Sequence, residues 1–145
     1  GPLLAIPMLR AYNQNFKPSR YLSEPKSMLT LIVITADTEE EAKYLARPIE
    51  LMWAQLVTGK QDLKIHTLEE ANNHIYTLDE ERATERNKDR FVIGSTETVA
   101  EKLHLLAKES LVDEIINADF YPNQESRKKG HRLLAKELGL IQVEL

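Results

Sequence analysis

The chain has 145 residues, of which 19 are basic and 23 acidic, so its formal net charge at pH 7 is −4. This balance does not indicate a nucleic-acid surface, which is normally basic overall or on one face. The absence of cysteine excludes disulfides, zinc–thiolate sites and a cysteine nucleophile, and it fits a reducing cytoplasm. No apolar run has the length of a membrane span, and the chain is long enough for one domain with its own core.

The first two predicted elements are a helix and a buried strand. The apolar residues of the helix fall four apart and share one face: Leu4, Met8, Tyr12 and Phe16. Lys17-Pro18 ends this helix. Residues 28–36 are apolar at nearly every position, which is typical of a strand that is buried on both faces of a parallel sheet.

A long helix is expected directly after this strand, up to about Thr58. Thr38 and Glu41 have the spacing of a capping box, and three carboxylates fall in the first turn, where the helix dipole favours them. Pro48 lies inside the helix and predicts a kink. The acidic cluster could be a metal site or a solvated helix start, and we favour the helix start. The core stripe of the helix is Ala42, Leu45, Ile49, Met52, Trp53 and Leu56.

Residues 60–90 differ in character from the rest of the chain, because they contain many charges and few aliphatic side chains. Two short exposed helices are expected here. Such an excursion between two strongly patterned units is typical of a lid or binding loop. Arg82, Arg86 and Arg90 could reach an anionic ligand from this lid, or they could belong to a solvated helix face.

The histidines are scattered along the chain, at His66, His74, His104 and His131, and no pair has the spacing of metal ligands. We therefore expect no metal site. A nucleophile elbow, a Walker motif and a dinucleotide-binding glycine motif are also absent from the sequence. We assign no catalytic residue within this chain.

Residues 91–120 are expected to form one βαβ unit with parallel strands and a right-handed crossover. Its first strand ends in the turn Gly94-Ser95-Thr96, which leads into a helix with the buried stripe Val99, Leu103 and Leu106. The free N–H groups of a helix N-terminus can hold an anion such as phosphate. Gly94, Ser95 and Thr96 are therefore candidate cofactor contacts.

Tyr121 directly follows the second strand of this unit, at the end of the sheet where parallel α/β folds bind ligands. It is a further candidate cofactor contact, or else a packing aromatic. Residues 125–138 are expected to form a last amphipathic helix, in which Gly130 permits a close approach of backbone or ligand. A tail with some β character follows at residues 140–145.

Five segments together resemble the C-terminal part of bacterial luciferase-like, flavin-dependent monooxygenases. They occur in one order and spacing: residues 15–19 (NFKPS), 35–42 (TADTEEEA), 92–99 (VIGSTETV), 113–116 (DEII) and 132–135 (RLLA). The resemblance covers almost the whole chain. Two positions depart from the family pattern: Thr96 stands where proline is common, and Gly130 stands where serine is common.

The resemblance implies a (β/α)8 TIM barrel of which this chain, residues 1–145, would supply about three βα units, with the lid at 60–90. It further implies FMN that is supplied reduced by a flavin reductase, and O2 that oxygenates a small organic substrate. The reacting groups and most flavin-phosphate contacts would precede Gly1, so the chain alone would be an inactive fragment that associates with itself to cover its strand edges. Two alternatives remain: a self-contained α/β binding or interaction module, and a non-catalytic luciferase-like flavoprotein.

Overall fold

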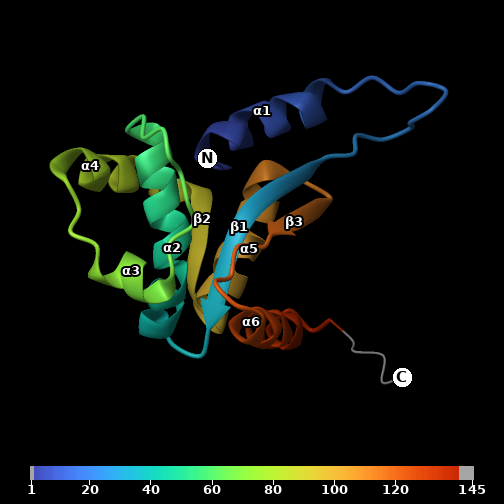
Figure 1. Ribbon diagram of the computed structural model, residues 1–145. Helices are drawn as coiled ribbons and strands as arrows, with labels where there is room; N and C mark the ends of the chain where they lie inside the picture. Colours follow the sequence, from blue (N-terminus) through green and yellow to red (C-terminus); the bar gives the residue numbers. More distant parts are fainter. Residues whose placement is uncertain (1, 141–145) are drawn as a thin grey trace.

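In the computed structural model, which describes residues 2–140, helices alternate with parallel strands (Figure 1). The strands are β1 (Met28–Ala36), β2 (Phe91–Ser95) and β3 (Glu114–Ala118). The helices are α1 (Pro2–Asn15), α2 (Glu39–Val57), α3 (Leu68–Asn73), α4 (Leu78–Asn87), the 3-10 turn η1 (Lys88–Arg90), α5 (Thr96–Ser110) and α6 (Gln124–Glu137). Of the predicted tail at 140–145, all but Leu140 lies outside the described residues. None of these helices is both long and apolar enough to cross a membrane.

The sheet has the order β2-β1-β3, and both pairs of neighbouring strands are parallel. The second half of β1 pairs with β2, from Ile32 opposite Phe91 to Ala36 opposite Ser95. The first half pairs with β3, from Met28 opposite Glu114 to Ile32 opposite Ala118. The parallel α/β class is therefore as predicted, but β2 and β3 are not neighbours as the predicted βαβ unit required. The longest and most apolar strand lies between them.

This order puts helices on both faces of the sheet. The chain moves from β1 to β2 in one direction and from β2 to β3 in the other. Right-handed crossovers therefore place the two connecting helices on opposite faces. α2 packs on one face of β1 and α5 on the other. Figure 1 shows α5 behind β1, with α2 to the left of it. In a (β/α)8 barrel consecutive strands lie side by side, so β2 would separate β1 from β3.

β1 is buried from both sides, as its continuous apolar pattern predicts. Its even-numbered residues from Ile32 to Ala36 join the core that α2 covers, with Leu45, Ala46 and Ile49. The odd-numbered residues Leu29, Leu31 and Val33 join the core that α5 covers, with Val99, Leu103 and Leu106. The alternation of a strand thus divides one apolar run between two cores.

The predicted face of α1 is not the face that packs. Leu4 and Met8 are 76% and 74% exposed. The contacts to the core below α5 come instead from Ala5, Ile6 and Leu9. The four-residue spacing therefore predicted the helix correctly, but it did not identify the side that faces the rest of the molecule.

Residues 60–90 pack along α2. Both short helices begin with complete capping boxes, at Thr67 with Glu70 and at Thr77 with Glu80. Two small side chains, Ala71 and Ala83, are fully buried in this segment. The segment has few aliphatic residues, and its close contact with α2 is made through alanines and through polar groups described below.

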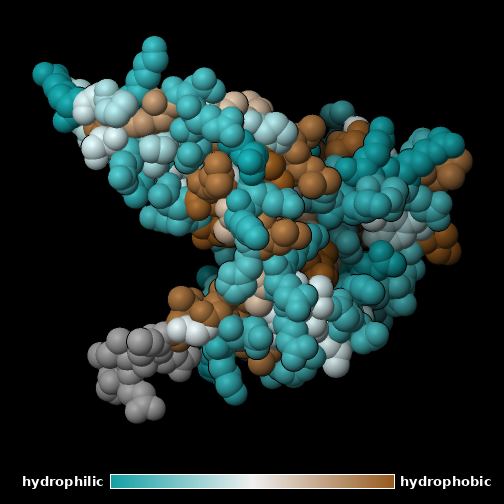
Figure 2. All heavy atoms as spheres, turned by 180° about the vertical axis from the view of Figure 1, so that it is seen from behind, coloured by the Kyte–Doolittle hydropathy of each residue, from teal (hydrophilic) through white to brown (hydrophobic). Residues whose placement is uncertain are grey.

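Hydrophobic groups reach the surface in several places when the molecule is seen from behind (Figure 2). Ile116 in β3 and Phe120, two residues after the end of β3, are 42% and 40% exposed. Among the strands of residues 2–140, β3 lies at an edge of the sheet and pairs with β1. An open sheet with partly exposed apolar side chains at its edge is a surface that proteins normally cover.

Candidate functional site

The three parallel strands run toward the same side of the sheet, which we call the carboxyl edge, although β3 ends opposite Ile32, before the end of β1. Ala36 at the end of β1 is paired with Ser95 at the end of β2. α6 contacts β1 near this end and lies beside its arrowhead in Figure 1. The turn Gly94-Ser95-Thr96 and Tyr121 both lie here, as predicted. In open parallel sheets this edge is the usual place for a ligand.

The turn at the start of α5 already holds an anion, which is the side chain of Glu39. The Ser95 N–H donates a hydrogen bond to Glu39 Oε1 at 3.0 Å. Hydrogen bonds from Thr98 and from Ser95 lower the pKa of Glu39. A Cβ on Gly94 would lie 2.9 Å from the other carboxylate oxygen. Glycine at this position therefore leaves the space that the carboxylate occupies.

Thr96 joins the ends of two strands. Its hydroxyl donates to the Ala36 carbonyl at 3.3 Å. The buried hydroxyl of Thr35 donates to the Gly94 carbonyl at 3.0 Å. These bonds fix the turn against β1, and the side chain of Thr96 makes a bond that a proline at this position could not make.

Tyr121 also has a structural role, because its hydroxyl is hydrogen-bonded to the backbone of β1. Its hydroxyl accepts a hydrogen bond from Thr35 N at 2.9 Å and lies 3.3 Å from Thr35 O, to which it donates. Burial raises the pKa of this hydroxyl. Gly130 makes room for the ring, because a Cβ there would lie 2.2 Å from the Tyr121 hydroxyl. The close approach predicted at Gly130 is therefore a contact with Tyr121.

The three predicted lid arginines lie at the other end of the sheet. Arg82 and Arg86 are on α4, which packs on α2 near the start of β2 (Figure 1). Arg82 pairs with Asp79 at 3.7 Å, with both side chains exposed. Arg90 directly precedes β2 and stacks on Trp53, with its guanidinium carbon 4.9 Å from the ring centre. The structure therefore does not bring these arginines together with the predicted cofactor contacts.

Two histidines that are far apart in sequence meet in a polar cluster under residues 60–90. His66 Nε2 lies 3.1 Å from Gln55 Oε1, and the Gln55 amide donates to Glu80 at 3.3 Å. The second oxygen of Glu80 lies 2.9 Å from His74 Nε2. Glu80 and Gln55 are buried, so this cluster fastens α4 to α2. It is not a metal centre: in the part of the chain that the structure describes, no group of three or more ligand side chains could hold an ion.

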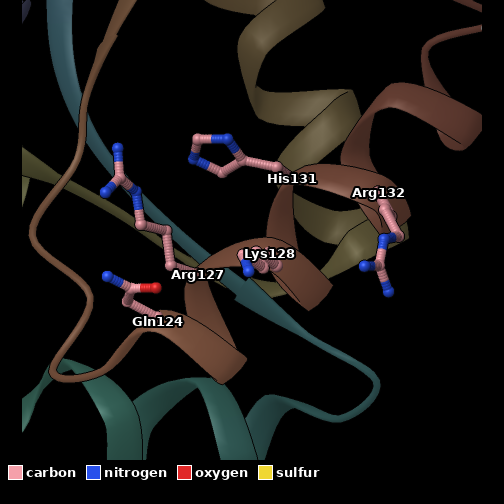
Figure 3. Close-up of a pocket in the computed structure, with 5 residues that line it drawn as sticks. All are labelled: Gln124, Arg127, Lys128, His131 and Arg132. Atoms are coloured by element: carbon pink, nitrogen blue, oxygen red, sulfur yellow. The ribbon is translucent and has the colours of Figure 1, made fainter.

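A basic pocket lies on α6, beside the carboxyl edge. Its volume is about 370 Å³, and Figure 3 shows the five side chains that line it: Gln124, Arg127, Lys128, His131 and Arg132. Asp119, after β3, pairs with Arg127 and lies 3.2 Å from His131 Nε2. The sequence prediction did not select this pocket, although the run of residues 127–132 (RKKGHR) is the densest basic segment of the chain.

No protein-family model matches the chain. It is 35% identical over 127 residues to the uncharacterized protein YceB of Bacillus subtilis, a match that covers 88% of this chain and 38% of YceB. It is 24% identical over 128 residues to a luciferase-like monooxygenase of Escherichia coli K12, a match that covers 86% of this chain and 37% of that protein. The chain is related to luciferase-like monooxygenases. It spans less than two fifths of the length of these relatives.

Two solved structures resemble the fold. The crystal structure of apo-MsnO8 aligns with a TM-score of 0.76 at 19% identity, over 95% of this chain and 42% of that one. The oxygenating constituent of 3,6-diketocamphane monooxygenase of Pseudomonas putida, a type II Baeyer–Villiger monooxygenase in complex with FMN, aligns with a TM-score of 0.50 at 17% identity. This alignment covers 99% of this chain and 42% of the monooxygenase chain. The luciferase-like resemblance predicted from five sequence segments is thus confirmed.

Proposed function

We propose that the chain is part of an FMN-dependent, luciferase-like monooxygenase that uses O2 to oxygenate a small organic substrate. The observation that carries this proposal is the sequence relation to a luciferase-like monooxygenase over 86% of the chain. The likeness in fold to a monooxygenase crystallised with FMN supports the choice of flavin. Reduced FMN would supply the electrons for the reaction with O2. A flavin reductase would produce this reduced FMN in the cytoplasm.

We also propose that residues 1–145 form one segment of a larger (β/α)8 barrel, with residues 60–90 as a lid-like excursion. The sheet order supports this proposal, because β2 and β3 are the outer strands within residues 2–140 and a three-stranded open sheet leaves backbone groups at both edges to be paired. In a barrel, β3 would have to lie beside β2. Alone, the chain is expected to lack activity and to form homo-oligomers through these edges.

The site residues have specific parts in this proposal. Gly94, Ser95 and Thr96 would form a minor contact with the cofactor. A phosphate that bound there would have to displace the carboxylate of Glu39 from the Ser95 N–H. Tyr121 would contact the cofactor with the ring rather than with the hydroxyl, because Thr35 engages the hydroxyl. Arg82, Arg86 and Arg90 would reach a substrate only if the excursion moved toward the carboxyl edge.

The test compares this chain with the longer protein that contains it. Each is supplied with FMN, a flavin reductase, NADH and a panel of aldehydes and ketones, and oxygenated product is measured by mass spectrometry with ¹⁸O2. The proposal expects labelled product from the longer protein and none from the chain alone. If the longer protein gives no labelled product and binds no FMN, the proposal is wrong. Submicromolar FMN binding by the chain alone would favour a self-contained flavoprotein.

A further inference from the structure

We propose that an open notch beside the first half of β1 binds the carboxyl-terminal residues of an extended peptide, with Arg90 bound to the free carboxylate of that peptide. This binding activity goes beyond the proposed oxygenase function and does not depend on a flavin. Three observations support it: a stretch of strand edge without a partner, a cavity beside this edge, and a cation at the end of the notch.

The staggered pairing of β1 leaves this notch in the sheet. β2 begins opposite Ile32, so residues 28–31 pair with β3 on one side and, within residues 2–140, with no strand on the other. Backbone N–H and C=O groups alternate between the two sides of a strand, so every second residue of this stretch presents both groups to the notch. Among the described residues, no loop, helix or side chain supplies these groups with a hydrogen bond. Beyond the end of β3, by contrast, the Tyr121 hydroxyl bonds to both backbone groups of Thr35.

A cavity of about 270 Å³ lies against the notch and is lined by Ala5, residues 29–32, Trp53 and Arg90. It is small for a ligand pocket, so it fits the last residues of a peptide better than a long strand. Its lining is mostly aliphatic, so we expect an apolar terminal residue. The indole N–H of Trp53 is buried and has no hydrogen-bond partner in the described part of the chain. An oxygen of the peptide backbone or carboxylate is the acceptor that would satisfy it.

Arg90 lies at the end of the notch, because it directly precedes Phe91, the first residue of β2. Two contacts hold its guanidinium in place: it stacks on Trp53, and its Nε donates a hydrogen bond to Asn87 Oδ1 at 3.1 Å. No carboxylate pairs with it among the described residues. A guanidinium binds a carboxylate through two parallel N–H···O bonds, so Arg90 offers an oriented site for one carboxylate.

The position of Arg90 selects the direction of the peptide and the need for a free end. An added strand that runs parallel to β1 continues the line of β2 and ends beside Arg90, where its carboxylate meets the guanidinium. An antiparallel strand would bring a positively charged amino terminus to the same place, and an internal segment would bring no charge at all. The strand edge at residues 28–31 is about 13 Å long, which is enough for three or four peptide residues.

The experiment measures binding of short peptides to the 145-residue chain and to the longer protein that contains it. The probe is acetylated Thr-Gln-Thr-Val-Leu, with a free or an amidated carboxyl terminus. Two further peptides with free carboxylates carry N-methyl groups on one or the other alternate set of amides, so that one of them cannot pair with β1. Fluorescence reports binding, because Trp53 lines the cavity and is the only tryptophan of the chain.

Three variants test the role of Arg90. Arg90→Gln removes the charge, and Arg90→Lys keeps the charge without the planar guanidinium. Arg132→Gln is the matched control, because Arg132 is an exposed arginine outside this cavity. Circular dichroism checks that each variant is folded. If Arg90→Gln does not fold, the comparison of acid and amide peptides on the wild type and on Arg90→Lys still decides.

We expect the free acid to bind about tenfold or more tightly than the amide on the wild type. Arg90→Gln should reduce this preference to less than about threefold, whereas Arg90→Lys should keep most of it and Arg132→Gln should leave it unchanged. One of the two N-methylated peptides should bind like the unmodified peptide, and the other should lose about tenfold or more in affinity. Added salt should weaken the preference for the acid.

Equal affinity for the acid and the amide would overturn the proposal, as would equal losses in Arg90→Gln and Arg132→Gln. Binding that neither N-methylated peptide loses would show that the peptide does not pair with β1, and the proposal would be wrong. If the chain binds the peptide and the longer protein does not, a strand of the longer protein fills the notch, and the proposal is equally wrong. None of these results depends on oxygenase activity, which the ¹⁸O2 experiment measures separately.

Discussion

The hydroxyl of Tyr121 bridges the backbone N–H and C=O of Thr35. β3 pairs with β1 only as far as Ile32, and the chain then turns away. The tyrosine hydroxyl therefore takes the place that a neighbouring strand would otherwise fill, and it satisfies both backbone groups of Thr35. The sequence predicts a cofactor contact at Tyr121. In the structure its hydroxyl instead satisfies the edge of β1.

Removing this hydroxyl should destabilise the fold. Tyr121→Phe leaves the backbone groups of Thr35 without their partner, which is expected to cost about 1–3 kcal/mol in the free energy of unfolding. Urea denaturation followed by circular dichroism measures the change. Tyr44→Phe is the matched control, because Tyr44 is 49% exposed and should change stability by less than about 0.5 kcal/mol. Equal stability of the Tyr121 variant and wild type would contradict the bridging role.

Gly130→Ala should also destabilise the protein, against the usual preference for alanine in a helix. The added Cβ would lie 2.2 Å from the Tyr121 hydroxyl and 3.0 Å from the Thr35 carbonyl. Because backbone and the half-buried ring of Tyr121 must shift, the expected loss is about 1–3 kcal/mol. Lys136→Ala, at an exposed position of the same helix, provides the comparison. A gain in melting temperature for Gly130→Ala would show that the contact is looser than described.

Glu80 should make stability depend on acid pH. Burial alone would raise its pKa, but hydrogen bonds from the Thr77 N–H, His74 and Gln55 outweigh burial and lower the pKa from 4.5 to about 2. The folded state therefore binds this proton less readily than the unfolded state. The stability that Glu80 contributes is complete above pH 4.5 and is lost as the pH falls toward 2. We expect this loss to be about 1–3 kcal/mol.

The measurement compares wild type with Glu80→Gln by denaturant unfolding at several values of pH. The difference in the free energy of unfolding between the two proteins should be largest above pH 4.5 and should shrink as the solution becomes more acidic. Glu81→Gln, an exposed neighbour in α4, should follow the wild-type curve. A constant difference across the whole range would mean that the Glu80 carboxylate has no lowered pKa.

The strand order can be tested by cross-linking, since the chain has no cysteine of its own. Thr30 and Ile116 are register partners of β1 and β3, and both are exposed. Thr30→Cys with Ile116→Cys should form a disulfide on mild oxidation of the chain, because neighbouring strands bring Cα atoms within bonding range. Mass spectrometry after proteolysis identifies the linked peptides. In a barrel with consecutive strands this disulfide should not form, so its formation in the longer protein would argue against the barrel.

Local patterns predicted the elements well. The apolar run at 28–36 gave a strand buried on both faces, and the stripe Val99, Leu103 and Leu106 packs as expected. Strand order was not predictable in this way. Periodicity reports which residues of a strand are buried, and it contains no information about which strand lies on either side. The helices on both faces follow from that order, so they could not be inferred either.

The polar contacts were harder to predict because they join distant residues. Glu39 lies in an acidic cluster that serves equally well as a helix start, and only folding brings it to Ser95. The Thr38 cap was predicted and its hydroxyl does accept the Glu41 N–H, but the Glu41 carboxylate pairs with Lys129 rather than completing the box. His66 and His74 likewise meet only because Gln55 and Glu80 are buried between α2 and α4.

The central place of β1 has a consequence for synthesis of the chain. Its partners are residues 91–95 and 114–118, so none of its interstrand bonds can form until most of the chain has been made. Such distant pairings form slowly. This nine-residue apolar strand therefore stays without strand partners while the ribosome makes the residues up to β2 and β3, and an exposed apolar segment of this kind is prone to aggregation. Early contact of β1 with α2, the helix made directly after it, is the local interaction that can shield one of its faces during that interval.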